Sequence, residues 1–462
     1  MSNGHAVIGG YFLVAYVLPM AANLAFAEEI VPTYKVYPLT VECILAVGAV
    51  YLLFLLLSAT RVPLAPAIDT GLAHPLIESL GRVCARGRIA VALVAVPVGV
   101  VSFLAGQTSY RYSDEAISEA DLVSRSLLLI VILLNVVITV DFVYRMFVSR
   151  EAATRMGGKR FVENVLLALA LVVMANGTIS LFLALIALLW SLRPAILDQL
   201  LFTPMQRGRR NEWIVASGSA MVFLVVLVVA WYYGTLIKIS SSRGVGTLLL
   251  DWDLMTVLSG GSSEASITSV LYYFVERYSI FYYSLVFTVA APAAERSYDA
   301  VSALVFPLQA LWFRVDYLLG GLLQMVKPEV GSIAQLNYQL LTAGVIRSRE
   351  GSAPGLIASF NYVFAFPLNL LCCAAYLRWL GNRIEDLLRQ QRGRRLSPFG
   401  VLLLMTFLQA FFQSPFDFLT VIDDAAIYVG LVSGVALSQR EPRLRTAPVP
   451  LSLLETTGGE TG

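Results

Sequence analysis

Ten long apolar runs, separated by short charged segments, determine what this chain of 462 residues can fold into. A helix that crosses a lipid bilayer needs about 20 mostly apolar residues, because hydrocarbon offers no partner to backbone N–H and C=O groups. The runs predict an all-α, polytopic membrane bundle of about ten transmembrane helices. The expected spans are residues 6–27, 38–58, 89–106, 126–147, 163–176, 178–192, 212–233, 353–376, 398–414 and 418–437.

Composition agrees with a membrane protein and excludes other classes. Apolar residues make up 58% of the chain and charged residues 14%, against about 45–50% and about 25% in soluble domains. Disordered chains, disulfide-stapled folds and coiled coils need the opposite composition. A net charge of +2 gives nucleic acid no electrostatic reason to bind. Four cysteines and two histidines lack the spacing of a metal site, so no metal or cofactor is expected.

Two of the expected spans allow a second interpretation. Residues 163–192 form one apolar stretch broken only by Asn176-Gly177, which favours a tight hairpin of two short or tilted helices. A single kinked helix there would invert every later span. Near the N-terminus, Ala25-Phe26-Ala27 resembles a signal-peptidase site, but no Lys or Arg precedes the run, so we expect the first helix to be retained.

The distribution of Lys and Arg predicts the topology. With a cytoplasmic N-terminus, 22 of the 33 Lys and Arg residues lie on the inner side, in segments 61–88, 145–160, 193–210, 378–395 and 440–445. A single helix over 163–192 would separate two of these clusters, which also favours the hairpin. Both termini are then cytoplasmic, and the predicted parts are an N-terminal bundle of about seven spans (1–233), a large extracytoplasmic loop (234–352), about three C-terminal spans (353–437) and a cytoplasmic tail (438–462).

The outer face carries the residues that could support chemistry. A loop as long as 234–352 usually carries function, and its aromatic-rich amphipathic stretches at 271–289 and 301–319 are expected to lie on the membrane surface or cap the bundle. The sequence Arg-Tyr-Ser occurs twice outside, at Arg111-Tyr112 and, after Glu276, at Arg277. Paired guanidinium groups suit a pyrophosphate, since each binds two oxygens and keeps its charge; the alternative is a pair of interfacial, snorkelling arginines.

More polar residues gather before the chain re-enters the membrane. Cations there would create a positive field for an anionic head group, and a carboxylate could act as general base on an acceptor hydroxyl. The alternatives are ordinary basic residues at a helix end and solvated or salt-bridged carboxylates. The residues of this run are Arg314, Asp316, Lys327, Asn337, Tyr338, Arg347, Arg349 and Glu350.

This arrangement resembles bacterial oligosaccharide repeat-unit polymerases of the Wzy type, which are relatives of O-antigen ligases. The resemblance covers the last third of the chain, and the rest only as topology. It rests on the large outer loop before the last three spans and on Pro307, Lys327-Pro328, Gly331-Ser332, Asn337-Tyr338, Ser352-Ala353-Pro354-Gly355 and Asn361-Tyr362. It implies a GT-C-like bundle in the bacterial inner membrane with the large loop in the periplasm.

The resemblance also implies a function. A metal-independent glycosyltransferase would polymerise undecaprenyl-diphosphate-linked repeat units into O-antigen, capsule or exopolysaccharide, with the lipid-linked donor and acceptor and the bilayer as partners and a chain-length regulator as a further candidate. Arg111 and Arg277 would hold the diphosphate, and Glu276 or Glu350 would be the base. Lys327, Arg347 and Arg349 would steer the substrate, and the expected binding set is completed by Tyr112, Arg314, Asn337 and Tyr338.

Two other functions stay open. A ligase-type transferase would share the fold, but O-antigen ligases are associated with a histidine in the outer loop, and the loop 234–352 contains none. A transporter or flippase for lipid-linked sugars belongs to a different class. Transporters tend to show internal repeats and broken helices, whereas this sequence shows no convincing repeat of its halves and has its large loop on one side only.

Overall fold

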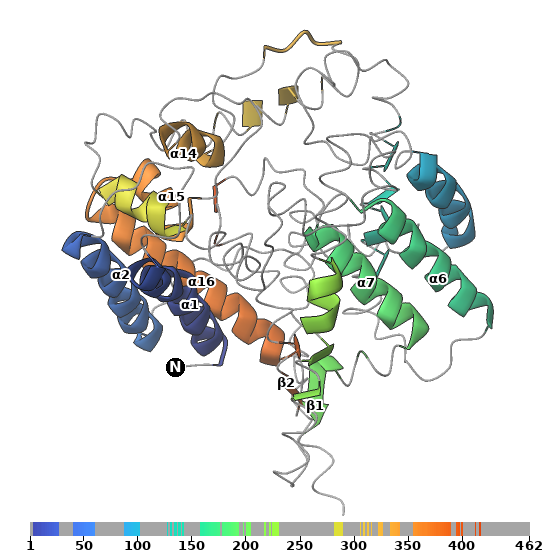
Figure 1. The fold of residues 1–462 in the computed structure, drawn as a ribbon, viewed down its shortest axis with the longest axis horizontal. Helices are drawn as coiled ribbons and strands as arrows, with labels where there is room; N and C mark the ends of the chain where they lie inside the picture. Colours follow the sequence, from blue (N-terminus) through green and yellow to red (C-terminus); the bar gives the residue numbers. More distant parts are fainter. Residues whose placement is uncertain are drawn as a thin grey trace, which may run out of the picture.

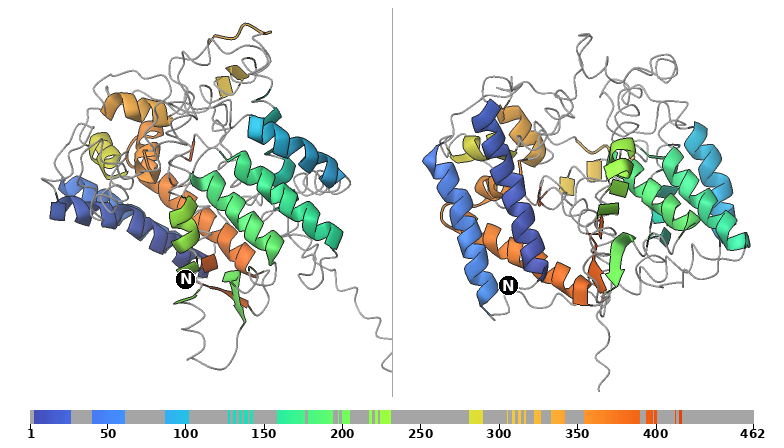
Figure 2. Two further views of the ribbon diagram at one scale, coloured as in Figure 1. Left: turned by 45° about the vertical axis from the view of Figure 1, so that its right-hand side comes forward. Right: turned by 60° about the horizontal axis from the view of Figure 1, so that its bottom comes forward.

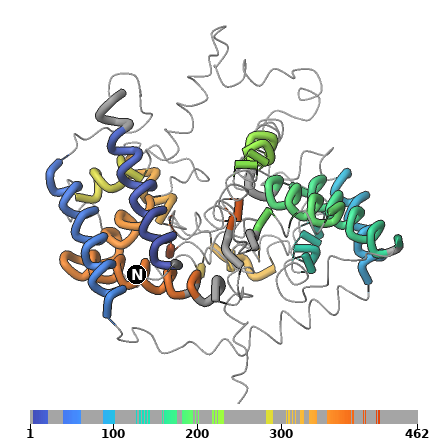
Figure 3. Tube along the Cα trace, turned by 90° about the horizontal axis from the view of Figure 1, so that it is seen from below, coloured from blue at the N-terminus to red at the C-terminus, as the bar shows by residue number. Residues whose placement is uncertain are grey.

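The computed structural model describes a helical protein that also contains one short two-stranded ribbon (Figure 1). Two groups of helices lie on opposite sides of the molecule in Figures 1 and 3. The structure describes residues 3–26, 40–60, 87–101, 158–175, 178–193, 200–204, 224–230, 281–289, 322–326, 333–341, 354–389 and 394–397, together with 197, 217–218, 221–222, 399–400, 412, 415–416 and isolated positions within 127–142 and 305–316.

The first group is built from helices at the two ends of the chain. It contains α1 (Asn3–Phe26), α2 (Val41–Ala59) and the long α16 (Leu368–Arg389). The Gly4 N–H donates to Glu385 Oε2 at 2.9 Å, and the Tyr16 hydroxyl accepts a hydrogen bond from the Ile357 N–H at 2.8 Å. Gly4 lies beside Glu385 and His5 lies beside Gly381, so α1 runs antiparallel to α16. Together with the Tyr16 contact, this means that the first helix completes its core with residues from the last third of the chain.

Glycine allows α1 and α16 to approach closely. A Cβ added at Gly4 would overlap the Gly381 carbonyl oxygen and the Glu385 backbone nitrogen, neither of which can rotate away. Small residues at such crossings let helix backbones come together.

We expect Gly4→Ala to destabilise the protein by about 1–3 kcal/mol, because the two backbones must separate. Gly10→Ala is the matched control, since a Cβ at Gly10 meets no atom within 4 Å and alanine favours a helix by up to about 1 kcal/mol over glycine. Thermal unfolding of the purified protein in detergent measures both. A Gly4→Ala protein as stable as Gly10→Ala would contradict the close crossing.

The C-terminal end of α2 is hydrogen-bonded to α16, and the outer surface of α2 is apolar. The buried Arg378 guanidinium of α16 donates to the Thr60 carbonyl at 2.9 Å, which satisfies a carbonyl at the C-terminal end of α2 and places a cation there. The α2 side chains that face away from the bundle are large, apolar and more than half exposed: Val41, Ile44, Leu45, Leu52 and Leu56. Within the described residues, two helical segments are long and apolar enough to cross a membrane, Gly4–Ala21 and Val41–Ala59.

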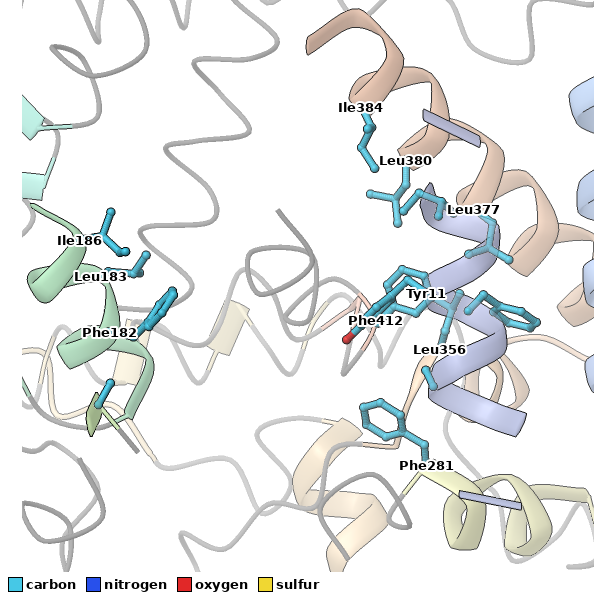
Figure 4. Close-up of a cluster of buried hydrophobic side chains, with 14 of the residues drawn as sticks. Tyr11, Phe182, Leu183, Ile186, Phe281, Leu356, Leu377, Leu380, Ile384 and Phe412 are labelled. Atoms are coloured by element: carbon cyan, nitrogen blue, oxygen red, sulfur yellow. The ribbon is translucent and has the colours of Figure 1, made fainter. Parts of the chain in front are cut away.

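Interlocking aromatic and aliphatic side chains form the core of this group (Figure 4). The Tyr11 ring meets the Phe412 ring edge to face, with centroids 4.6 Å apart. Leu377, Leu380 and Ile384 recur along α16 at three- and four-residue intervals and are buried, as an inward helix face requires.

The second group confirms the predicted hairpin over 163–192. The structure has two helices there, α6 (Gly158–Val173) and α7 (Thr178–Leu192), and they lie side by side (Figures 1 and 2). The Ser191 hydroxyl, near the end of α7, donates to the Asn164 carbonyl, near the start of α6, at 3.2 Å. The helices are therefore antiparallel, and the single kinked helix is excluded.

A buried ion pair joins the expected third and fourth spans in this group. The helix Gly87–Val101 carries Arg88, whose guanidinium lies 3.2 Å from Asp141 Oδ1. Arg88 is near the start of one expected span, and Asp141 is near the end of the next. Phe142 then meets Trp190 of α7 edge to face, with centroids 5.8 Å apart.

A short ribbon lies beside the lower end of α16 (Figures 1 and 2). Its strands β1 (Phe202–Pro204) and β2 (Arg394–Leu396) pair antiparallel, with Thr203 opposite Arg395. The sequence predicted no strands, so the all-α expectation is correct for the bundle and misses this ribbon. Three-residue strands that lie far apart in the sequence carry too weak a pattern to be recognised.

The expected eighth span, 353–376, is two helices in the structure. α15 (Leu356–Val363) ends before a turn at Phe366-Pro367, and α16 begins at Leu368 and continues to Arg389. Proline disfavours helix at the residue before it, which explains the break. α16 extends beyond residue 376, where the apolar run ends, because its last turns are rich in Leu, Arg and Glu, which favour a helix.

Candidate functional site

The structure describes two of the eleven expected site residues, Asn337 and Tyr338. Both lie on α14 (Ile333–Leu341), at the opposite end of the molecule from the β1–β2 ribbon (Figure 1). Asn337 is fully buried and Tyr338 is half-buried. The other nine lie outside the described residues: Arg111, Tyr112, Glu276, Arg277, Arg314, Lys327, Arg347, Arg349 and Glu350.

Asn337 joins three segments of the chain through its side-chain amide. Its Nδ2 donates to Ser284 Oγ of the helical segment 281–289 at 2.9 Å. The Tyr362 hydroxyl of α15 donates to Asn337 Oδ1 at 2.8 Å. Both ends of the amide therefore contact buried hydroxyl groups, which position the side chain, and the role of Asn337 in substrate binding stays a prediction.

A second row of hydrogen bonds runs beside the first. Asn361 Nδ2 donates to Thr288 Oγ1 at 3.1 Å, and Asn369 Nδ2 of α16 donates to Asn361 Oδ1 at 2.5 Å. Ser284 and Thr288 are four residues apart and so share one face of their helix. The two rows connect four elements, and we call their members the amide junction: Ser284, Thr288, Asn337, Asn361, Tyr362 and Asn369.

The segment that enters α15 depends on glycine. Gly355 has φ +76°, in the left-handed region that residues with a Cβ avoid, and a Cβ there would lie 2.9 Å from Phe281 Cγ. Ser359 Oγ and the Ser359 N–H both donate to the Gly355 carbonyl, at 2.7 and 3.0 Å. This glycine therefore lets α15 start directly against the helical segment 281–289.

Asp316 has a structural role in place of the expected chemical one. Its side chain is buried, and its carboxylate accepts hydrogen bonds from the Leu323 N–H at 2.6 Å and the Met325 N–H at 2.9 Å. Between these donors, Gln324 takes a positive φ of 49°. A carboxylate whose two oxygens each accept a backbone N–H holds a turn in place.

The amide junction offers neutral hydrogen-bond donors and acceptors. Its six side chains are amides and hydroxyls, which suit hydroxyl-rich ligands and supply neither a nucleophile nor a strong base. Within the part of the chain that the structure describes, no group of three His, Cys, Asp or Glu side chains could hold a metal ion.

The sequence contained a partial signal for this site. Asn361-Tyr362 belongs to the run that carries the family resemblance, although no role was assigned to it. Ser284 and Thr288 sit inside the aromatic stretch 271–289, where they look like ordinary helix residues. Their contacts with Asn337 and Asn361 join positions 53 and 73 residues apart, and a periodic pattern in one sequence does not encode such pairs.

We expect Asn337→Leu to destabilise the protein by about 1–3 kcal/mol, because two buried hydroxyl groups each lose a partner. Gln339→Leu, the same kind of change at a half-buried position of α14, is the control and should be nearly neutral. Thermal unfolding and protease sensitivity of the purified variants test this. An Asn337→Leu protein that unfolds at the wild-type temperature would contradict this structural role.

Comparisons with known proteins give no relative for the chain. No family model matches it, and no curated protein or solved structure matches it.

Proposed function

We propose that this protein is a ten-span, GT-C-like inner-membrane glycosyltransferase of the Wzy type. It would polymerise undecaprenyl-diphosphate-linked oligosaccharide repeat units at the periplasmic face, with the diphosphate held by Arg111 and Arg277. Such a reaction needs no nucleotide, because the lipid diphosphate leaving group carries its own activation. Arginines stabilise the charge that develops on it in the transition state.

The contacts between distant segments support the proposed topology. Four of them join residues that the Lys and Arg pattern assigns to the cytoplasmic side or to span ends on that side: Gly4 with Glu385, Thr60 with Arg378, Arg88 with Asp141, and β1 with β2. The amide junction joins two segments of the predicted outer loop to the expected eighth span, which enters the membrane from that side. A membrane between the two sets is consistent with the apolar outer surface of α2.

The observation that carries the proposal is the way the large loop is anchored. Two of its segments, 281–289 and 333–341, are hydrogen-bonded to α15, which follows the loop directly, through Asn361 and Tyr362. These contacts hold two segments of the predicted loop against α15, and in the sequence Arg277 precedes the first segment and Arg347 follows the second. An enzyme acting on a membrane-embedded lipid needs such a fixed surface on one side, whereas alternating access gives no reason for it.

The deciding experiment is an assay with the purified protein and a lipid-linked repeat unit as both donor and acceptor. A ladder of products with increasing repeat number supports a polymerase. Transfer only to a different lipid or protein acceptor would indicate a ligase. Movement of intact lipid-linked units across vesicles, without new glycosidic bonds, would indicate a flippase. Activity is expected to persist in excess chelator, and restoration by added metal would overturn the arginine mechanism.

A further inference from the structure

In the second row of the amide junction, formed by Thr288, Asn361 and Asn369, the hydrogen bonds determine which atom is the donor and which is the acceptor at each contact. The Thr288 hydroxyl donates its single proton to the Leu285 carbonyl, at 3.1 Å, so toward Asn361 it can only accept. The atom of Asn361 that faces Thr288 is therefore the donor Nδ2, and Asn361 Oδ1 is left to accept from Asn369 Nδ2. The single proton of the threonine hydroxyl thus determines the orientation of both amides. The row consequently ends at Asn369 Oδ1, an acceptor.

Asn369 Oδ1 is buried and has no hydrogen-bond partner. The residue is 8% exposed, and its N–H donates to the Ala365 carbonyl at 3.1 Å, which holds the first turn of α16 against the preceding segment. An unsatisfied buried amide oxygen costs about tenfold or more in the folding equilibrium and requires an explanation. The group that would satisfy it is a donor, an O–H or an N–H.

The residues around Asn369 Oδ1 indicate which class of ligand could supply the donor. Within α15, Asn361 is half-buried and every other residue is buried. In the adjoining turn Phe366 is 78% exposed, and at the start of α16 Leu368 and Leu371 are about half exposed. The six side chains of the amide junction carry no charge, which does not suit a phosphate. Neutral amides beside an exposed aromatic ring suit a saccharide, which offers hydroxyl donors and an apolar ring face.

We propose that Asn369 Oδ1 accepts a hydroxyl hydrogen bond from a saccharide whose ring lies against Phe366. Leu368 and Leu371 are three residues apart on α16 and share its outward face, where they would lie against the lipid chain of a lipid-linked saccharide. This sugar subsite deepens the proposed polymerase and rests on it for the identity of the sugar. It is separate from the expected diphosphate site, whose residues are cationic.

Binding measurements with the full-length protein in nanodiscs test the subsite. The probes are the host's lipid-linked repeat unit, the free oligosaccharide released from it by mild acid, and undecaprenyl diphosphate alone. Asn369→Leu is expected to weaken binding of the free oligosaccharide about tenfold, the effect of one hydrogen bond. Binding of undecaprenyl diphosphate is expected to be unchanged. The Tm is expected to change little, because removing the unsatisfied Oδ1 offsets the loss of the Nδ2 hydrogen bond to the half-buried Asn361.

Phe366→Ala provides a second variant with little risk to folding, since this side chain is mostly exposed, and it should also weaken the free oligosaccharide selectively. Leu322→Ala, a change at a 76% exposed side chain outside the site, is the control. Wild-type binding of the free oligosaccharide by both Asn369→Leu and Phe366→Ala would overturn the subsite while leaving the polymerase proposal intact. A wild-type protein that binds only the lipid-linked unit, with binding insensitive to Asn369→Leu, would also overturn it. If wild-type protein makes no product ladder in the assay, the polymerase proposal itself is wrong.

Discussion

Arg277→Ala is expected to abolish long-chain polysaccharide and to let the lipid-linked single repeat unit accumulate. In the proposed mechanism the guanidinium binds two diphosphate oxygens and stabilises the charge of the leaving group. Loss of one preorganised charge contact of this kind typically lowers kcat by about 10²–10³. Arg277→Lys should also impair the enzyme, since an ammonium group cannot replace a bidentate fork. The measurement is the polysaccharide ladder of cells that express each variant at wild-type level.

Arg296→Ala is the control for Arg277, because it removes the same charge from the same predicted loop outside the expected site. It should leave the ladder unchanged. Normal chain length in a well-expressed Arg277→Ala strain would remove Arg277 from the mechanism. Equal losses from Arg277→Ala and Arg296→Ala would point to a general need for positive charge in the loop.

Arg88→Met is expected to destabilise the protein by about 3–5 kcal/mol, the typical result of removing one partner of a buried ion pair. The Asp141 side chain is 1% exposed and Arg88 is 12% exposed, so solvent replaces little of the lost interaction. The double variant Arg88→Met/Asp141→Leu should regain most of the loss, since apolar groups of similar volume often substitute for a buried pair. Thermal unfolding in detergent gives both values.

The matched control for Arg88→Met is Arg160→Met, at an exposed position of α6, which should change stability by no more than about 0.5 kcal/mol. If Arg88→Met and Arg160→Met unfold together, the pair contributes nothing to stability. If the double variant is no more stable than Arg88→Met, then Asp141 is needed for its other interactions rather than for Arg88.

Sequence reasoning located helices best where one physical signal dominated. Length and apolar composition placed α1, α2 and α7 to within about three residues of their ends, and Asn176-Gly177 marked the α6–α7 hairpin. The same signal failed at α15 and α16, because an apolar run reports compatibility with lipid and not the continuity of a helix. Pro367 was the available warning of that break.

The candidate site was harder to foresee, for a different physical reason. Charge and aromatic content directed attention to arginines and carboxylates, whereas the described contacts are made by neutral amides and hydroxyls. Asn337 was selected for substrate binding, yet its amide is shared between Ser284 and Tyr362. Asp316 was considered as a base, yet it holds two backbone N–H groups. Such roles depend on which distant segment lies opposite, and that information belongs to the assembled fold.

The antiparallel contact between α1 and α16 has a consequence for biosynthesis. Gly4 and Glu385 are 381 positions apart, and a ribosome that adds about 5–20 residues per second needs roughly 20–75 s to span that interval. During this time the earliest helix has emerged, but its backbone and Tyr16 hydroxyl still await their final neighbours. Nascent chains that stop before residue 389 therefore carry an unfinished bundle, and quality-control proteases are expected to clear them faster than the completed product.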